Sequence, residues 1–163
     1  FPLIESADVQ KKFPDTIILT VTERKQFAVF CSQDDRCFAI DENGIIFEEL
    51  KSPSQDLILL KKDLISEEIF LGQGVIEKSM IDFIYKISDY LKNNFQIDVK
   101  ETFVSNPFVV KTSENWEIYF NPKEDINLEI AKLDALLKNE ITLEKRKNLQ
   151  YIYLQYKDRA YYK

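Results

Sequence analysis

Residues 149–162 read LQYIYLQYKDRAYY and hold five of the eight tyrosines of the chain. Aromatic and β-branched side chains fit a half-buried pleated surface, so this stretch is predicted to be a β-strand. Alternation places Ile152, Leu154 and Tyr156 on the face directed toward the core, and the odd-numbered residues on the other face. A terminal strand is often the edge of its sheet, where one row of backbone groups is open to a strand from another protein.

The composition predicts one globular domain, or one domain with a small addition, and argues against nucleic acid as a partner. The chain has 163 residues, of which 45% are hydrophobic and 31% charged. Its net charge is −6, whereas phosphate contacts need a clustered basic face. The C-terminal region is locally basic, and its positive charges form either a solvated rim or part of a binding surface: Lys145, Arg146, Lys147, Lys157, Arg159 and Lys163.

Hydrophobic periodicity predicts both helices and strands, with strands dominating the first third of the chain. Apolar side chains at helical spacing predict helices over 76–95 and 126–138. Strands are predicted over 16–23, 26–31, 37–41, 45–48, 97–104, 108–112 and 116–121, ahead of the terminal strand. The Asn-Gly pair before residue 45 is a strong signal for a tight hairpin turn.

Two residues have specific expected roles within these elements. Trp116 shares its parity with Ile118 and Phe120, so we expect it to pack against the sheet rather than to act as an exposed binding anchor. Asp125 stands directly before the second predicted helix, where its carboxylate can cap the first turn.

Cys31 and Cys37 flank a short polar turn between two apolar segments. The pattern predicts a hairpin with one cysteine at each shoulder, where a cross-strand disulfide is geometrically feasible and would indicate an oxidising compartment. Two free thiols beside a loop are the alternative. Two cysteines without any histidine leave too few soft ligands for a metal site, so we expect no metal.

The sequence offers little chemistry for catalysis or for a cofactor. It has no histidine, which removes the usual general base and every Ser-His or Cys-His nucleophile, and its three glycines cannot supply a phosphate-binding loop. Acidic pairs such as Asp34-Asp35 and Asp41-Glu42 fall in predicted turns. We therefore expect a protein that is not an enzyme and has no cofactor or small-molecule substrate. A hydrolase with an acidic site is a minor alternative, which would need a deep cleft lined by two carboxylates.

Residues 13–30, FPDTIILTVTERKQFAVF, resemble the end of the POTRA domain and its junction with the next domain in the bacterial cell-division family FtsQ/DivIB. The resemblance rests on a proline, alternating apolar residues and a Glu-Arg pair, here Pro14, Ile18, Val21, Glu23, Arg24 and Ala28. A following Asp-x-x-Gly with an apolar tail is also typical of the family, and here it is formed by Asp41, Gly44, Ile46 and Phe47.

The terminal segment resembles the closing strand of the same family. Tyr151, Ile152, Leu154 and Tyr156 match the family pattern, and the helix that contains Lys132 and Leu133 stands where the family has its Lys-Leu helix. Tyr153 and Gln155 replace an Asp and an Arg of the pattern. These two departures fall on the outer face of the strand.

The resemblance implies an α+β fold, a mainly antiparallel sheet with two packed α-helices, preceded by a POTRA C-terminal hairpin. Residues 1–24 would form that hairpin, which alone is marginal in water and must lean on its neighbour or lack its partners. Residues 25–163 would form the FtsQ-type β domain. The chain starts at Phe1 without a Met, and we expect it to belong to a longer single-pass membrane protein whose anchor precedes this extracytoplasmic region.

The resemblance also implies a function: a non-enzymatic scaffold of the division septum that binds FtsB-like and FtsL-like proteins. The FtsB-like segment would add a strand to the C-terminal edge. The implied partner-binding residues are Tyr156, Lys157, Asp158, Arg159, Ala160, Tyr161 and Tyr162. A secretion or outer-membrane assembly protein that contains POTRA domains is the alternative; it would carry tandem POTRA repeats and a membrane barrel.

Overall fold

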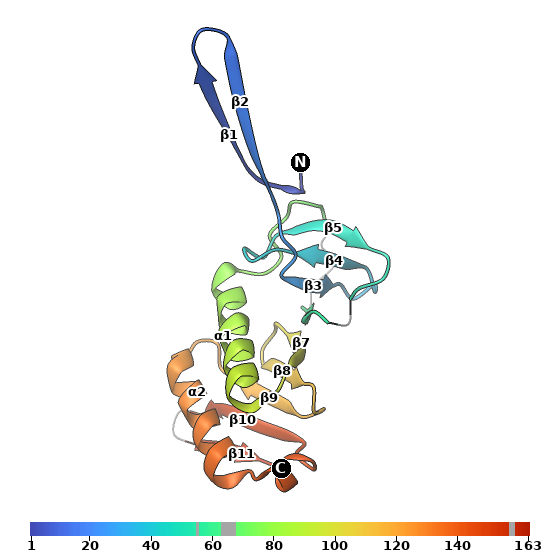
Figure 1. Ribbon diagram of the computed structural model, residues 1–163. Coiled ribbons are helices and arrows are strands. Elements are labelled where there is room, and N and C mark those ends of the chain that lie inside the picture. The colour runs from blue at the N-terminus through green and yellow to red at the C-terminus, as the bar shows by residue number, and fades with distance from the viewer. Residues whose placement is uncertain (55, 63–67, 157–158) are drawn as a thin grey trace.

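The computed structural model of the chain describes residues 1–54, 56–62, 68–156 and 159–163 as a projecting hairpin and a β-sheet packed against helices (Figure 1). The hairpin consists of β1 (Ile4–Lys12) and β2 (Thr16–Glu23). Within the described ranges the sheet has nine strands: β3 (Ala28–Cys31), β4 (Cys37–Ile40), β5 (Ile46–Leu50), β6 (Leu59–Lys61), β7 (Val99–Phe103), β8 (Phe108–Thr112), β9 (Glu117–Phe120), β10 (Tyr151–Tyr156) and β11 (Arg159–Tyr162).

Both predicted helices are present, and the described residues contain further helical turns. The helices are α1 (Lys78–Phe95), α2 (Ile126–Ala135) and α3 (Leu143–Arg146), and a π-helical segment, η1 (Leu136–Glu140), continues α2. Asp125 caps α2 as predicted, because its side chain accepts a hydrogen bond from the backbone N–H of Asn127 at 2.8 Å. In the described part of the chain no helix is long and apolar enough to cross a membrane.

The fold is α+β, but the prediction of a mainly antiparallel sheet is wrong, because the sheet is mixed. Its strand order is β11-β10-β9-β8-β7-β6-β3-β4-β5. Three of the neighbouring pairs are parallel: β3 with β6, β6 with β7 and β9 with β10. The connection through α1 returns the chain to β7 in the direction of β6, and the connection through α2 does the same between β9 and β10. Parallel neighbours need such crossover connections, which short turns cannot provide.

The core lies between α1, α2 and one face of the sheet. Trp116 is fully buried, as predicted from its parity with the inward residues of β9. The ring of Phe83 in α1 meets the rings of Phe108 and Phe120 edge-on, with centroids 5.1 and 5.7 Å apart. Leu133 of α2 and Ile152 of β10 belong to the same buried cluster. The opposite face of the sheet, called here the outer face, carries the alternate side chains.

The turn between β4 and β5 requires its glycine. Gly44 has a φ of 78°, a region that side chains with a Cβ rarely adopt. A Cβ on Gly44 would also collide with the backbone carbonyl of Ile76, so the turn and the start of α1 are packed backbone to backbone. The Asn-Gly hairpin that the sequence predicts is present here.

The terminal segment differs from its prediction as one continuous strand. It forms a hairpin in which β11 folds back antiparallel on β10. The pairing shifts between Tyr153 and Tyr156, which marks a β-bulge. Bulges bend a strand and re-aim its side chains. Ile152 and Leu154 are fully buried, whereas Tyr156 is 56% exposed, so the predicted inward face ends before Tyr156.

The hairpin of β1 and β2 projects away from the sheet and is held only at its base within the described structure (Figure 1). Every residue of β2 is exposed. Its exposed apolar residues, together with those of β1 and the connecting turn, are Val9, Phe13, Ile17, Ile18, Leu19 and Val21. At the base, Arg24 donates to the backbone carbonyl of Pro2 at 3.0 Å and forms a largely buried ion pair with Asp41. This ion pair joins two motif residues that lie 17 positions apart in the sequence.

Candidate protein-binding site

The candidate site is the edge of the sheet formed by β11. The residues expected to bind a partner divide into three groups. Tyr156 ends β10, and Arg159, Ala160, Tyr161 and Tyr162 form β11. Lys157 and Asp158 lie outside the described residues. β11 pairs with β10 on one side only, and the strand order leaves its other side as the end of the sheet.

The direction of the backbone groups in β11 follows from its pairing. Tyr151 and Lys163 exchange two backbone hydrogen bonds, at 3.3 and 3.2 Å. Because hydrogen-bonded and non-hydrogen-bonded pairs alternate in an antiparallel ladder, Tyr153 with Tyr161 is the next bonded pair, and Ile152 with Tyr162 lies between them. The N–H and C=O of Tyr162 therefore point away from β10. By the same alternation, the backbone groups of Ala160 also point toward the open edge.

Side chains of β11 alternate between the two faces of the sheet. Ala160 packs against the core, and Tyr162 stands opposite the buried Ile152. Tyr161 stands opposite Tyr153 on the outer face and is 47% exposed. Alternation places Arg159 and Lys163 on the same outer face as Tyr161, and both are exposed.

Lys132 of α2 fixes the end of β10 beside this edge. Its ammonium group donates to the backbone carbonyls of Leu154 at 3.2 Å and Tyr156 at 2.9 Å. Lys132 was predicted to lie on a helix, but these contacts were not predicted. They come from chain segments more than twenty residues apart, so no local signal could have revealed them.

A shallow depression of about 460 Å³ adjoins the end of β10. Residues from the β7–β8 turn, the end of β9 and the end of β10 line it, among them Asn106, Pro122, Gln155 and Tyr156. Its lining is mixed polar and apolar, and it places Gln155, one of the two departures from the family pattern, beside the exposed ring of Tyr156.

Tyr153, the other departure, belongs to a group of stacked tyrosines on the outer face. The ring centroid of Tyr153 lies 4.2 Å from that of Tyr119 and 4.8 Å from that of Tyr151. The hydroxyl of Tyr119 donates to Glu117 at 2.7 Å, and this hydrogen bond, together with burial, raises the pKa of Tyr119 well above its usual value. On this part of the outer face the side chains of β9 and β10 are therefore held by aromatic contacts.

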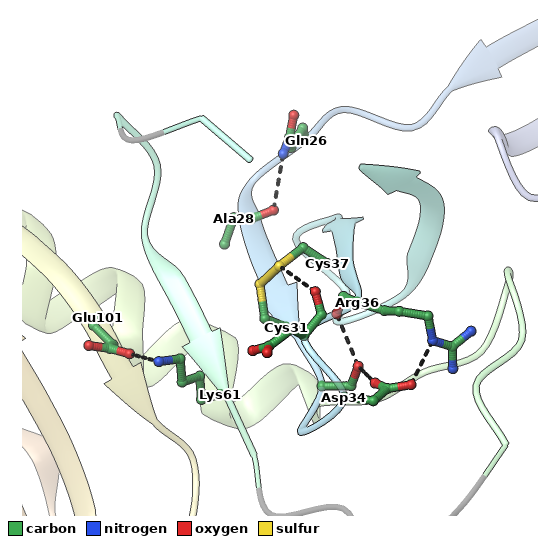
Figure 2. The surroundings of a disulfide bond; sticks show 10 residues. Gln26, Ala28, Cys31, Asp34, Arg36, Cys37, Lys61 and Glu101 are labelled. Carbon is green, nitrogen blue, oxygen red and sulfur yellow. Dashed lines mark hydrogen bonds and ion pairs between the residues drawn. A yellow bond between two sulfur atoms is a disulfide. The ribbon is translucent and has the colours of Figure 1, made fainter. Parts of the chain in front are cut away.

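Cys31 and Cys37 stand directly opposite each other on β3 and β4 and are joined by a disulfide (Figure 2). Their Cα atoms are 4.1 Å apart. Asp34 and Arg36 form an ion pair within the intervening turn, and Lys61 with Glu101 forms another on the neighbouring strands (Figure 2). The disulfide thus closes the β3–β4 hairpin at its turn end.

Two of the acidic residues considered for catalysis, Asp34 and Asp41, have side-chain partners. In Asp41, one carboxylate oxygen pairs with Arg24 and the other accepts from the backbone N–H groups of Asn43 and Ile45, each at 2.9 Å. The depression beside Asp41, about 330 Å³, is also lined by Glu5, Glu23 and Glu42. Within the described residues, no group of three or more acidic or cysteine side chains is placed to hold a metal ion.

One buried carboxylate was not detected in the sequence analysis. Glu129 of α2 is fully buried, and one of its oxygens accepts from the backbone N–H of Asn121 at 2.9 Å. Its other oxygen has no hydrogen-bond partner in the described structure. Burial raises the pKa of Glu129 to about 7, against the opposing effects of the Asn121 N–H and the positive charge of Lys132. Glu129 ties α2 to the end of β9, as Lys132 ties it to the end of β10.

Comparison with known families bears on the hairpin. Residues 1–24 match the POTRA domain of FtsQ type. The match spans β1, β2 and the junction at Arg24, and it points to a role in protein interaction for this POTRA-type segment. A comparison with curated proteins found no match.

Proposed function

We propose that this chain is part of a non-enzymatic scaffold of bacterial cell division, of the FtsQ/DivIB kind, which binds FtsB-like and FtsL-like proteins. Binding would occur by addition of a partner strand to β11. The observation that carries the proposal is the outward direction of the backbone groups of Tyr162 on an uncovered edge strand. The match of residues 1–24 to the FtsQ-type POTRA domain supports the choice of this family over POTRA proteins of secretion.

The two edges of the sheet differ in a way that favours β11 as the docking edge. Beside β5, the loop residue Gln73 accepts a hydrogen bond from the N–H of Ile46 at 3.0 Å, and Gly72 donates to its carbonyl at 2.7 Å. A covering loop is one of the usual means by which a sheet edge avoids pairing. Among the described residues, β11 has no such loop along its outer side.

The proposed setting is the outer side of the cell membrane, reached through a single membrane-spanning helix that precedes this region in the longer protein. The disulfide between Cys31 and Cys37 supports an oxidising, extracytoplasmic location, because disulfides rarely persist in the reducing cytosol. The hairpin, with its exposed apolar residues, would be completed by the remainder of a POTRA domain.

The proposal is tested by removing one outward N–H from the edge. Tyr162→Pro deletes an N–H that points away from β10, so the pairing of β10 with β11 keeps its hydrogen bonds. The measurement is the affinity for the extracytoplasmic segment of the FtsB-like protein from the same organism, with a melting curve for each variant. We expect Tyr162→Pro to weaken binding at least about tenfold, since it removes a ladder hydrogen bond and introduces a ring at the interface.

Tyr162→Ala is the matched control, because it removes the same aromatic side chain as Tyr162→Pro and keeps the backbone N–H. It should bind more tightly than Tyr162→Pro. Equal affinity of Tyr162→Pro and Tyr162→Ala for the FtsB-like segment would overturn strand addition at β11.

A further inference from the structure

One row of side chains crosses the outer face of the sheet and ends at the docking edge. Each of its members stands directly opposite the next in the strand pairing. From β7 to β11 the row reads Phe103, Val109, Tyr119, Tyr153 and Tyr161. Directly opposed residues on one face of a sheet are the unit of side-chain stabilisation between strands. Tyr161 is therefore the last member of an apolar and aromatic row that an added strand would continue.

The charges on the outer face of β11 are positive. Arg159 and Lys163 stand two residues before and two residues after Tyr161, on the same face. Among the described residues, no carboxylate side chain forms an ion pair with either of them. These positive charges disfavour a lysine or arginine directly opposite them on an added strand, because like charges directly opposed destabilise a strand pair.

We propose that the partner strand of β11 runs antiparallel and follows a sequence rule: an aromatic or β-branched residue opposite Tyr161, and an aspartate or glutamate two residues later, opposite Arg159. This inference rests on the proposed function and deepens it by naming the chemistry of the partner. Antiparallel pairing is chosen because it is the more stable arrangement per residue. In this arrangement the residue two positions after the aromatic one stands opposite Arg159, and the residue two positions before it stands opposite Lys163.

The position opposite Tyr161 discriminates strongly between side chains. Tyr161 uses its own backbone groups to bond Tyr153, so toward a partner it is a non-hydrogen-bonded position. In such positions the two Cα atoms approach to about 4.5 Å, and the side chains touch more closely than in bonded pairs. A large apolar residue there continues the row beyond Tyr161, whereas a small polar residue leaves the outer side of Tyr161 in water.

The test uses three capped peptides and the intact chain. The first peptide, Thr-Val-Thr-Tyr-Thr-Glu-Thr-Val, contains the proposed pair; the second has Lys in place of Glu; the third has Ser in place of Tyr. Binding is measured from the shifts of the β11 amide signals in nuclear magnetic resonance spectra. We expect the first peptide to bind about threefold or more tighter than the other two, a ratio set by the usual strength of cross-strand side-chain pairs.

Arg159→Glu then reverses the charge on the protein. It should weaken the Glu peptide and strengthen the Lys peptide, each by about threefold. Lys100→Glu is the control for net charge, because Lys100 is exposed on β7, four strands or roughly 19 Å from β11. It should leave the order of the peptides unchanged.

The inference is overturned if Arg159→Glu does not reverse the preference, if the third peptide binds best, or if none of the peptides shifts the β11 signals. Failure of the proposed function is a separate result, read from Tyr162→Pro and the FtsB-like segment. If partner binding depends on the N–H of Tyr162 but not on the charge at Arg159, strand addition at β11 stands and the sequence rule is wrong.

Discussion

The ring of Tyr156 in β10 meets the ring of Tyr161 in β11 edge-on, with centroids 5.6 Å apart and planes at 87°. The β-bulge before Tyr156 makes this contact possible, because it turns a residue that alternation assigns to the core toward the edge strand. The pair stands beside Arg159, the residue opposite Tyr156 in the ladder. Tyr156 thus supports the edge tyrosine rather than the core.

Tyr156→Ala should weaken binding of the FtsB-like segment several-fold and lower the free energy of unfolding by no more than about 1.5 kcal/mol. The ring is largely exposed, so little core packing is lost, and an aromatic pair contributes about 0.5–1.5 kcal/mol. The affinity of the variant for the FtsB-like segment and its free energy of unfolding, from a urea titration, are the two quantities to measure.

Tyr85→Ala is the matched control for Tyr156→Ala. Tyr85 lies on α1, is 60% exposed and makes one ring contact, with Phe27 at 6.2 Å. It should lose a similar amount of stability and no affinity. If both variants lose the same affinity, Tyr156 has no specific role at the edge.

Lys132→Met should loosen the end of β10. The substitution keeps the apolar stem and removes the ammonium that bonds the carbonyls of Leu154 and Tyr156. We expect a loss of about 1 kcal/mol, below the usual range for charged hydrogen bonds because the site is partly exposed. Lys86→Met, which removes a surface bond to the side chain of Asn127, should change stability by less than about 0.5 kcal/mol. Equal losses in the two variants would contradict the anchoring role of Lys132.

Glu129 should make the stability of the chain depend on pH in an unusual direction. Its pKa is raised to about 7 in the folded state from an ordinary value of 4.5, so the folded chain holds this proton more tightly than the unfolded chain does. The free energy of unfolding should therefore fall as the pH rises from about 4.5 to about 7, by up to about 3 kcal/mol. The charged groups that face Glu129 are Lys132 and Glu124, which act in opposite directions.

Glu129→Gln isolates this effect from other titrating groups. The measurement is the difference in unfolding free energy between the unaltered chain and the variant, by urea titration at about pH 5 and about pH 8. The variant should gain relative to the unaltered chain as the pH rises. Glu144→Gln, a change on the exposed helix α3, should show no such gain. A pH-independent difference for Glu129→Gln would show that burial does not raise this pKa.

Loss of the disulfide should destabilise the β3–β4 hairpin region. The two cysteines are six residues apart, and closing a loop of this size restricts the unfolded chain by about 2 kcal/mol. A reducing agent should lower the melting temperature of the unaltered chain and leave that of the double variant Cys31→Ser, Cys37→Ser unchanged. An equal response of both proteins would exclude a stabilising disulfide.

Local sequence patterns predicted most elements of the fold, though not β6 or α3, and did not show how the strands are arranged. The strand predicted over 108–112 coincides with β8, and the parity of Trp116 placed it in the core. Parallel pairing, such as that of β9 with β10, was missed because it depends on crossovers through helices, which leave no mark on the strands themselves. The π-helical end of α2 was missed for a similar reason, since its apolar spacing continues the helical pattern.

The candidate site was predicted in part. The aromatic composition of residues 149–162 indicated an edge, but the return of β11 onto β10 was missed, because the sequence has no glycine or proline in this segment to indicate a turn. The buried carboxylate of Glu129 was also missed, because its burial comes from packing α2 against the end of β9, a contact between distant segments.

The most direct measurement of the central claim is residue-specific amide hydrogen exchange of β11 with and without the FtsB-like segment. In the free chain, the N–H groups of Ala160 and Tyr162 should exchange quickly, because they point toward the open edge, whereas that of Tyr161 should already be slowed by its pairing with β10. Bound partner should slow Ala160 and Tyr162 at least about tenfold through new ladder hydrogen bonds. Unchanged exchange at Ala160 and Tyr162 in a saturated complex would contradict strand addition at β11.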